Sequence, residues 1–122
     1  MSNSCSPPKK LTFLEAIQKL KINDKPVLVK FFAPWCGACQ EAKPAIHAAK
    51  CELEGDMETV AIDIDGDNLG MIAQEYGIES LPTVAIIHKG QVVAVTEGAT
   101  TTQDYVDLAR SYLKDNGYVE NE

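Results

Sequence analysis

The 122-residue sequence has no apolar run long enough to cross a membrane, and it is poor in basic residues. Its longest apolar run, residues 27–34, is interrupted by Lys30, whereas a membrane span needs about 20 apolar residues. Eleven Lys and Arg stand against eighteen Asp and Glu, and the resulting net charge of −7 repels phosphate backbones and anionic lipid surfaces. We therefore expect no membrane span and no nucleic-acid partner.

Cysteine is also scarce, since the chain has only Cys5, Cys36, Cys39 and Cys51. These are too few and too unevenly spaced to hold a domain of this size together. Apolar residues make up 45% of the chain and charged residues 24%, which allows an apolar core and excludes disorder of the main body. We expect one domain, in which the chemistry of the cysteines matters more than cross-linking.

The first ten residues are rich in Ser and Pro and lack the apolar stretch of a signal peptide. We expect a flexible N-terminal arm over residues 1–10, a folded domain over residues 11–117 and an acidic tail over residues 118–122. Without an export signal in the sequence, the expected location is the cytoplasm. In the alternative, a signal has been removed, and the protein is exported or attached to lipid through Cys5.

Hydrophobic periodicity predicts the order of the elements. A Thr-x-x-Glu capping box at Thr12–Glu15 begins a helix that ends before Asn23–Pro26. The remaining predicted elements are a buried central strand over residues 27–33, a helix over 37–53 kinked at Pro44, a strand over 59–64, a helix over 69–76, a hairpin of strands 83–88 and 91–96, and a helix around 105–113 that stops near Gly117. This order predicts an α/β fold, in which a mixed central sheet has helices on both faces.

The most informative motif is Trp35-Cys36-Gly37-Ala38-Cys39, which joins the predicted strand 27–33 to the predicted helix 37–53. Two cysteines three residues apart at a helix start can close a small disulfide ring. The unpaired amides and the positive end of the helix dipole favour a thiolate at the first cysteine. Cys36 is therefore the predicted nucleophile, and Cys39 is the thiol that resolves the mixed disulfide.

Two structural alternatives exist for these cysteines: an inert disulfide, or a zinc site formed by Cys36, Cys39, His47 and Cys51. In a continuous helix His47 lies about 12 Å along the axis from Cys39, whereas two ligands of one zinc lie within about 4 Å of each other. We therefore expect redox chemistry, with no metal and no cofactor. Cys51 is expected to pack as a small apolar side chain or to act as a regulatory thiol.

Other segments accompany the cysteine motif. Residues 31–39 read Phe-Phe-Ala-Pro-Trp-Cys-Gly-Ala-Cys, Pro44 follows, residues 76–83 read Tyr-Gly-Ile-Glu-Ser-Leu-Pro-Thr, and Lys89–Gly90 and Gly98–Ala99 are turn sequences. Together these segments resemble the thioredoxin family over about residues 11–113. The resemblance implies a thioredoxin-like fold, whose N-terminal edge strand is short or absent here because little sequence precedes Leu11.

The resemblance also implies a function and a substrate site. It implies a thiol–disulfide oxidoreductase, a monomer that reduces disulfide-containing proteins and receives electrons from a partner reductase. The Leu81–Pro82 peptide bond is expected to be cis and to lie beside the cysteine pair, with the Leu81 backbone binding an extended substrate. Trp35, Gly37, Leu81 and the loop at Gly98 are the expected walls of the substrate groove.

The sequence departs from the family's pattern at three positions. Lys30 replaces a buried carboxylate beneath the second cysteine, Ala61 replaces a nearby lysine, and Ala38 replaces the proline between the cysteines of reducing thioredoxins. We therefore expect Lys30 and Ala38 to influence the cysteine pair. The direction of electron flow stays open: the alternatives are an exported disulfide oxidase or isomerase, and a redox-silent adaptor that uses the groove only for binding.

Overall fold

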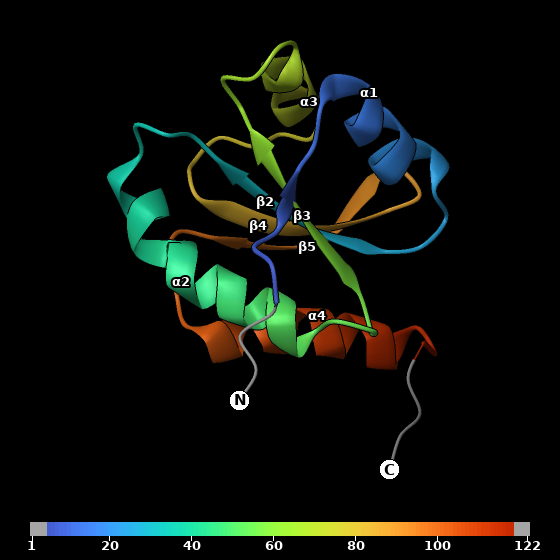
Figure 1. The fold of residues 1–122 in the computed structure, drawn as a ribbon. Coiled ribbons are helices and arrows are strands. Elements are labelled where there is room, and N and C mark those ends of the chain that lie inside the picture. Colours follow the sequence, from blue (N-terminus) through green and yellow to red (C-terminus); the bar gives the residue numbers. More distant parts are fainter. Residues whose placement is uncertain (1–4, 119–122) are drawn as a thin grey trace.

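Five strands form one mixed sheet in the order β1-β3-β2-β4-β5 in the computed structural model, which describes residues 5–118 (Figure 1). Strands β1, β3 and β2 run parallel, and β4 runs antiparallel to both β2 and β5. The strands are β1 (Lys9–Lys10), β2 (Val27–Phe32), β3 (Glu58–Asp63), β4 (Thr83–His88) and β5 (Gln91–Glu97). The mixed sheet predicted from the sequence is confirmed.

Helices cover both faces of the sheet (Figure 1). On one face lie α1 (Phe13–Ala16), the π-helix η1 (Ile17–Ile22) and α3 (Leu69–Glu75); on the other lie α2 (Gly37–Glu52) and α4 (Thr102–Asp115). Within residues 5–118, no helix combines the length and the hydropathy that a membrane crossing requires.

Strand β2 lies in the middle of the sheet and leads directly into the cysteine motif. Its side chains alternate between two apolar cores: Val27, Val29 and Phe31 pack on the α1 and α3 side, and Leu28 packs against α2 and α4. Each such side chain contributes about 1.5–3 kcal/mol when fully buried. This burial fixes the position at which the chain leaves β2 and enters the site.

The predicted helix after Thr12 divides into two helical types. Its start is confirmed, because the Thr12 and Glu15 side chains form a reciprocal capping box. After Ala16 the chain widens into the π-helix η1, in which the Asn23 N–H donates to the Gln18 carbonyl five residues earlier. The spacing of apolar residues predicts a helix here, but it does not distinguish a π-helix from an α-helix.

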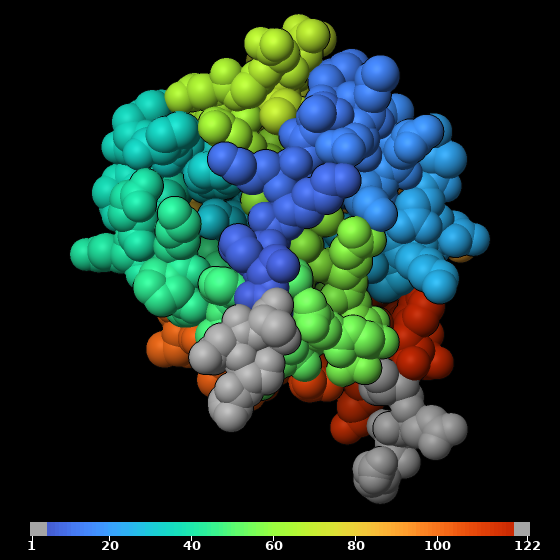
Figure 2. Space-filling model, in the orientation of Figure 1, coloured from blue at the N-terminus to red at the C-terminus, as the bar shows by residue number. Residues whose placement is uncertain are grey.

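Residues 5–10, which belong to the flexible arm expected over residues 1–10, contact the rest of the domain in the structure. Lys9 and Lys10 form β1, the Leu11 N–H donates to the Ala61 carbonyl at 3.0 Å, and Cys5 is disulfide-bonded to Cys51. Residues 5–10 therefore run across the surface from the α1 side of the sheet to α2 (Figure 2). The edge strand is present but only two residues long, in agreement with the expected short strand.

The expected acidic tail lies almost wholly outside the described residues, which end at Tyr118. Tyr118 itself is attached to the domain: its N–H donates to the Leu113 carbonyl at 2.8 Å, and its hydroxyl lies 3.2 Å from His88 Nε2. Residues 1–4 of the expected arm are also outside the described range.

Candidate functional site

Cys36 is the N-cap residue of α2, and Cys39 lies in the first turn of that helix. The two are joined by a disulfide with a Cα–Cα distance of 5.2 Å, so the structure shows the oxidised form of the pair. The Cys39 N–H points at the Cys36 sulfur across 3.1 Å. Because amides at a helix N-terminus have no partner within the helix, they favour negative charge on the capping atom. This geometry therefore favours a thiolate at Cys36 after reduction.

The cysteine pair is nearly covered, but the residue before it is not. Cys36 is 7% exposed and Cys39 3%, whereas Trp35 is 69% exposed. The Trp35 indole N–H donates to Asp65 at 2.7 Å, which holds the ring at the surface beside the pair. A pocket of about 280 Å³ opens there, with Trp35, Cys36 and Leu81 among its walls.

The sequence analysis did not identify Asp65 as a residue of this site. Asp65 follows the carboxyl end of β3, and the Ile64 N–H donates to the Phe32 carbonyl at the end of β2. Adjacent parallel strands therefore bring residue 65 next to residue 35. The parallel order of the two strands was the signal that could have predicted this contact.

The loop before β4 closes the other side of the site. The Leu81–Pro82 peptide bond is cis, and Leu81 packs against the small cluster formed by Ala33, Cys36 and Cys39. The Gly98 N–H donates to the Pro82 carbonyl at 2.8 Å, so the loop after β5 lies against the same proline. The structure thus brings Leu81 into contact with the cysteine pair, whereas Gly98 contacts the backbone of Pro82.

Gly37 and Ala38 form the first exposed turn of α2. A Cβ atom at Gly37 meets no atom within 4 Å, so glycine is not required there by packing. Both residues therefore contribute open surface next to the cysteine pair.

Lys30 lies in β2 beneath the start of α2 and is 7% exposed. Sheet register places Lys30, Ala61 and Lys10 in one row across β2, β3 and β1, and Lys43 lies one helical turn after Cys39. Burial lowers the pKa of Lys30, and the charges of Lys43 and Lys10 lower that pKa further. The Lys30 ammonium also lies 4.6 Å from the centre of the Phe32 ring.

The two remaining cysteines form a disulfide, Cys5–Cys51, which the sequence analysis did not predict. Cys51 is neither a simple apolar packing residue nor a free thiol in this structure, and cross-linking matters more than the cysteine count suggested. In this structure the Cys5 sulfur, the expected point of lipid attachment in the alternative, is bonded to Cys51. The pairing joins residues 46 apart, and no local pattern of the sequence indicates it.

His47 lies beside Cys5 and Cys51, not beside Cys36 and Cys39. One donor atom from each of Cys5, His47 and Cys51 lies within 4.8 Å of the other two. Both sulfurs of this cluster are used in the disulfide, so neither is a thiolate ligand in this form. The four residues considered as zinc ligands therefore lie in two separate places: Cys36 and Cys39 at the start of α2, and His47 and Cys51 beside Cys5.

Both the fold and the known relatives place this chain among the thiol–disulfide oxidoreductases. A family model described as thioredoxin matches residues 6–111. The thioredoxin of Porphyra purpurea is 40% identical over 96 residues, which cover 79% of this chain and 88% of that protein. The thioredoxin of Haemophilus influenzae is 40% identical over 91 residues, covering 75% and 83%. The chain belongs to the thioredoxin family.

A solved structure supports the same assignment. A mutant thioredoxin from Halobacterium salinarum NRC-1 superposes with a TM-score of 0.73 at 27% identity, covering 93% of this chain and 97% of that one. The likeness extends over nearly the whole length of both chains, so the strands and helices around the cysteine pair are part of the shared fold.

Proposed function

We propose that this protein reduces disulfide bonds in other proteins through the Cys36/Cys39 pair and regains its electrons from a partner reductase. The observation that supports this most is the position of Cys36 at the start of α2, with the Cys39 N–H 3.1 Å from its sulfur. A thiolate stabilised in this way is the attacking species in thiol–disulfide exchange. The exposed Trp35 ring and the pocket beside it supply a surface for the substrate chain.

The reaction has two exchange steps. The Cys36 thiolate bonds to one sulfur of the substrate disulfide, and the electron pair of the broken S–S bond leaves on the other substrate sulfur. Cys39 then loses its proton and attacks the Cys36 sulfur, which releases the second substrate thiolate. The product is the Cys36–Cys39 disulfide seen in the structure, and two electrons from the reductase restore the dithiol.

Lys30 supports the second step in this proposal. A protonated ammonium cannot accept the proton of Cys39, so Lys30 cannot replace the family's carboxylate as a base in that form. Its positive charge beneath α2 instead favours the Cys39 thiolate. Burial lowers the pKa of Lys30, so the ammonium is also easier to deprotonate than an exposed lysine.

The test is the reduction of insulin disulfides by dithiothreitol, followed by precipitation of the insulin B chain. The wild-type chain is expected to accelerate precipitation, and Cys36→Ser is expected to return it to the uncatalysed rate. The double variant Cys5→Ser with Cys51→Ser is the matched control and should keep the activity. No acceleration by the wild type, or an active Cys36→Ser variant, contradicts the proposal.

A second candidate function is disulfide formation or isomerisation by an exported protein. The Cys5–Cys51 disulfide supports it, because such bonds persist in oxidising compartments. Ala38 supports it too, since it lacks the proline of reducing thioredoxins. A glutathione titration of the Cys36/Cys39 reduction potential separates the candidates. A reductase is expected to have a potential of about −270 mV, and an oxidase or isomerase a potential between about −180 and −120 mV.

A further inference from the structure

Two residues of α2 that can bind a metal ion lie on one face of that helix. His47 and Cys51 are four residues apart within α2. Side chains at this spacing are neighbours on a helix, and such a pair can bind a single metal ion. Cys51 follows Cys36 by fifteen residues, so about 22 Å of helix separates this pair from the start of α2. The pair is therefore distinct from the Cys36/Cys39 site.

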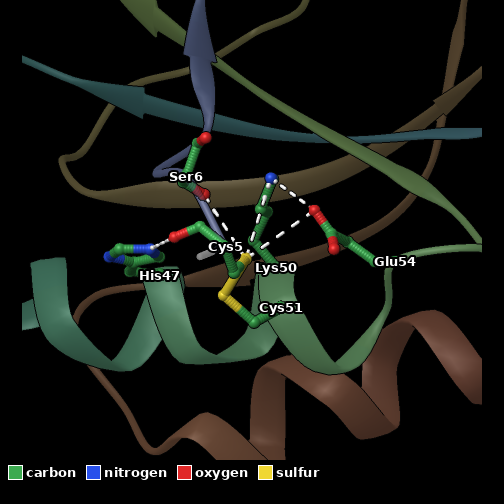
Figure 3. The surroundings of a disulfide bond; sticks show 6 residues. All are labelled: Cys5, Ser6, His47, Lys50, Cys51 and Glu54. Atoms are coloured by element: carbon green, nitrogen blue, oxygen red, sulfur yellow. Dashed lines mark hydrogen bonds and ion pairs between the residues drawn. A yellow bond between two sulfur atoms is a disulfide. The ribbon is translucent and has the colours of Figure 1, made fainter. Parts of the chain in front are cut away.

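The disulfide brings a third residue of this kind, Cys5, to the same place from the N-terminal segment (Figure 3). One donor atom from each of Cys5, His47 and Cys51 lies within 4.8 Å of the other two. The His47 Nε2 atom lies 3.0 Å from the Cys5 carbonyl oxygen, which holds the imidazole ring against the segment. All three residues are half-buried, so an ion can reach the cluster from the surface.

The spacing of the three donor atoms is close to the spacing that zinc requires. With Zn–S bonds of about 2.3 Å and a Zn–N bond of about 2.0 Å, tetrahedral geometry places two ligand atoms about 3.5–3.8 Å apart. The separation of up to 4.8 Å exceeds this by about 1 Å. Rotation about the side-chain bonds supplies changes of this size without a shift of the backbone.

The charged groups beside the cluster balance each other. The Lys50 ammonium lies 3.8 Å from the Cys5 sulfur, and the Glu54 carboxylate lies 3.7 Å from it. Lys50 and Glu54 are themselves paired at 2.8 Å, so together they add almost no net charge at the sulfur. The negative charge that attracts a cation therefore has to come from the cysteines as thiolates. Two thiolates and an imidazole are typical zinc ligands, whereas magnesium and calcium prefer oxygen.

We propose that Cys5 and Cys51 in their reduced form bind one zinc ion together with His47, with water in the fourth position. A dithiol reduces the S–S bond: the dithiol becomes a disulfide, and its two electrons and two protons leave Cys5 and Cys51 as thiols. Zinc then displaces the two thiol protons to the solvent and forms two Zn–S bonds, and the neutral His47 imidazole supplies the third bond. The oxidised form has no thiolate for the metal, so reduction switches the site on.

Zinc at this site joins the N-terminal segment to α2 in the reduced protein, as the disulfide does in the oxidised protein. Without either link, residues 5–10 remain attached through the two-residue strand β1, the His47 contact with the Cys5 carbonyl and the ion pair of Lys9 with Glu15. The inference goes beyond the proposed function and does not rest on it, because any dithiol can reduce the bond.

The experiment uses the full-length chain with Cys36→Ser and Cys39→Ser, so that the thiols at the start of α2 cannot bind the metal. The protein is reduced with a phosphine, freed of metal and titrated with zinc in competition with a chromogenic chelator. One zinc per chain is expected for the reduced protein and none for the oxidised protein. Cobalt in place of zinc should give thiolate-to-cobalt charge-transfer absorption and the visible bands of tetrahedral cobalt.

Substitutions of the two histidines test the ligand set. Even the loss of a group behind a metal ligand costs about 10- to 100-fold in affinity, so His47→Gln should weaken zinc binding at least about tenfold. His88→Gln is the matched control, because His88 is the only other histidine and lies at the end of β4. It should leave the affinity unchanged. Cys51→Ser should remove zinc binding at this affinity.

Four results overturn the inference. They are a reduced protein that binds no zinc, an oxidised protein that binds zinc as tightly, equal affinities of the His47→Gln and His88→Gln variants, and loss of the folded circular dichroism spectrum on reduction, since the fold then does not hold the three ligands together. Each of these can occur while the wild-type chain still reduces insulin, so a failure here leaves the proposed function intact.

Discussion

Removal of the Cys5–Cys51 disulfide is the perturbation whose effect on stability follows most directly from the structure. Cys36→Ser with Cys39→Ser is the reference background, because only one disulfide then remains. Adding Cys5→Ala and Cys51→Ala removes it. Among the described residues 5–118, this bond is the only disulfide that joins the N-terminal segment to α2.

The expected loss in the free energy of unfolding depends on the length of the chain segment that the disulfide closes into a loop. For a sequence separation of 46, the chain-entropy relation gives about 13.5 cal/mol/K, which is about 4 kcal/mol at 25 °C. A chain of 122 residues has an unfolding entropy of about 0.26 kcal/mol/K near 60 °C. The melting temperature is therefore expected to fall by about 15 °C.

The assay is urea unfolding followed by circular dichroism, with thermal melts alongside. The loss should appear as a lower urea midpoint. Weakening of β1 should leave the remaining sheet intact, because both residues of β1 are exposed and bury no apolar side chain. Chemical reduction of the reference variant should reproduce the effect of the alanine substitutions. A loss below about 1 kcal/mol in both experiments refutes the reasoning, since the bond then does not constrain the unfolded chain.

Three further substitutions test residues around the cysteine pair. Lys30→Met should slow the resolution of mixed disulfides and stabilise the fold at pH 7, by about 1.4 kcal/mol for each unit by which burial lowers the lysine pKa. The folded state binds the Lys30 proton less tightly than the unfolded state does. The stability of the wild type relative to Lys30→Met should therefore rise as the pH increases from the lowered pKa of Lys30 toward 10.5. If the urea midpoints of the two proteins change in parallel from pH 7 to 10, and their resolution rates are equal, Lys30 has no role at the site. Ala38→Pro removes an amide at the start of α2 and should lower the reduction potential by about 30 mV or more, and an unchanged or higher potential in a glutathione titration counts against it. Trp35→Ala should raise the KM for insulin more than it lowers the maximal rate, and an unchanged KM means that the exposed ring does not contact substrate.

The local patterns of the sequence predicted the elements that position the site. The apolar run before Cys36 predicted a buried central strand, and the observed β2 ends one residue before the predicted end. The Lys89–Gly90 turn predicted the β4–β5 hairpin, and both residues adopt positive φ angles, as a tight two-residue hairpin turn requires. These features depend on neighbouring residues, so a single sequence contains their signals.

Contacts between distant segments could not be predicted in the same way. Strand β1 is too short to show alternation, and its residues Lys9 and Lys10 have no apolar pattern. The Cys5–Cys51 bond and the contact of Trp35 with Asp65 depend on how the strands and α2 are placed in space. The row of Lys10, Ala61 and Lys30 likewise follows from sheet register, which the spacing of residues along the chain does not specify.

The central claim is that Cys36 attacks protein disulfides and Cys39 resolves the product. Its most direct measurement compares Cys39→Ser and Cys36→Ser, each in the Cys5→Ser and Cys51→Ser background, after incubation of the reduced chain with a disulfide-containing protein. Non-reducing gels and mass spectrometry should show a stable mixed disulfide on Cys36 in the Cys39→Ser variant and almost none in the Cys36→Ser variant. Equal trapping by both variants, or none by either, contradicts the account.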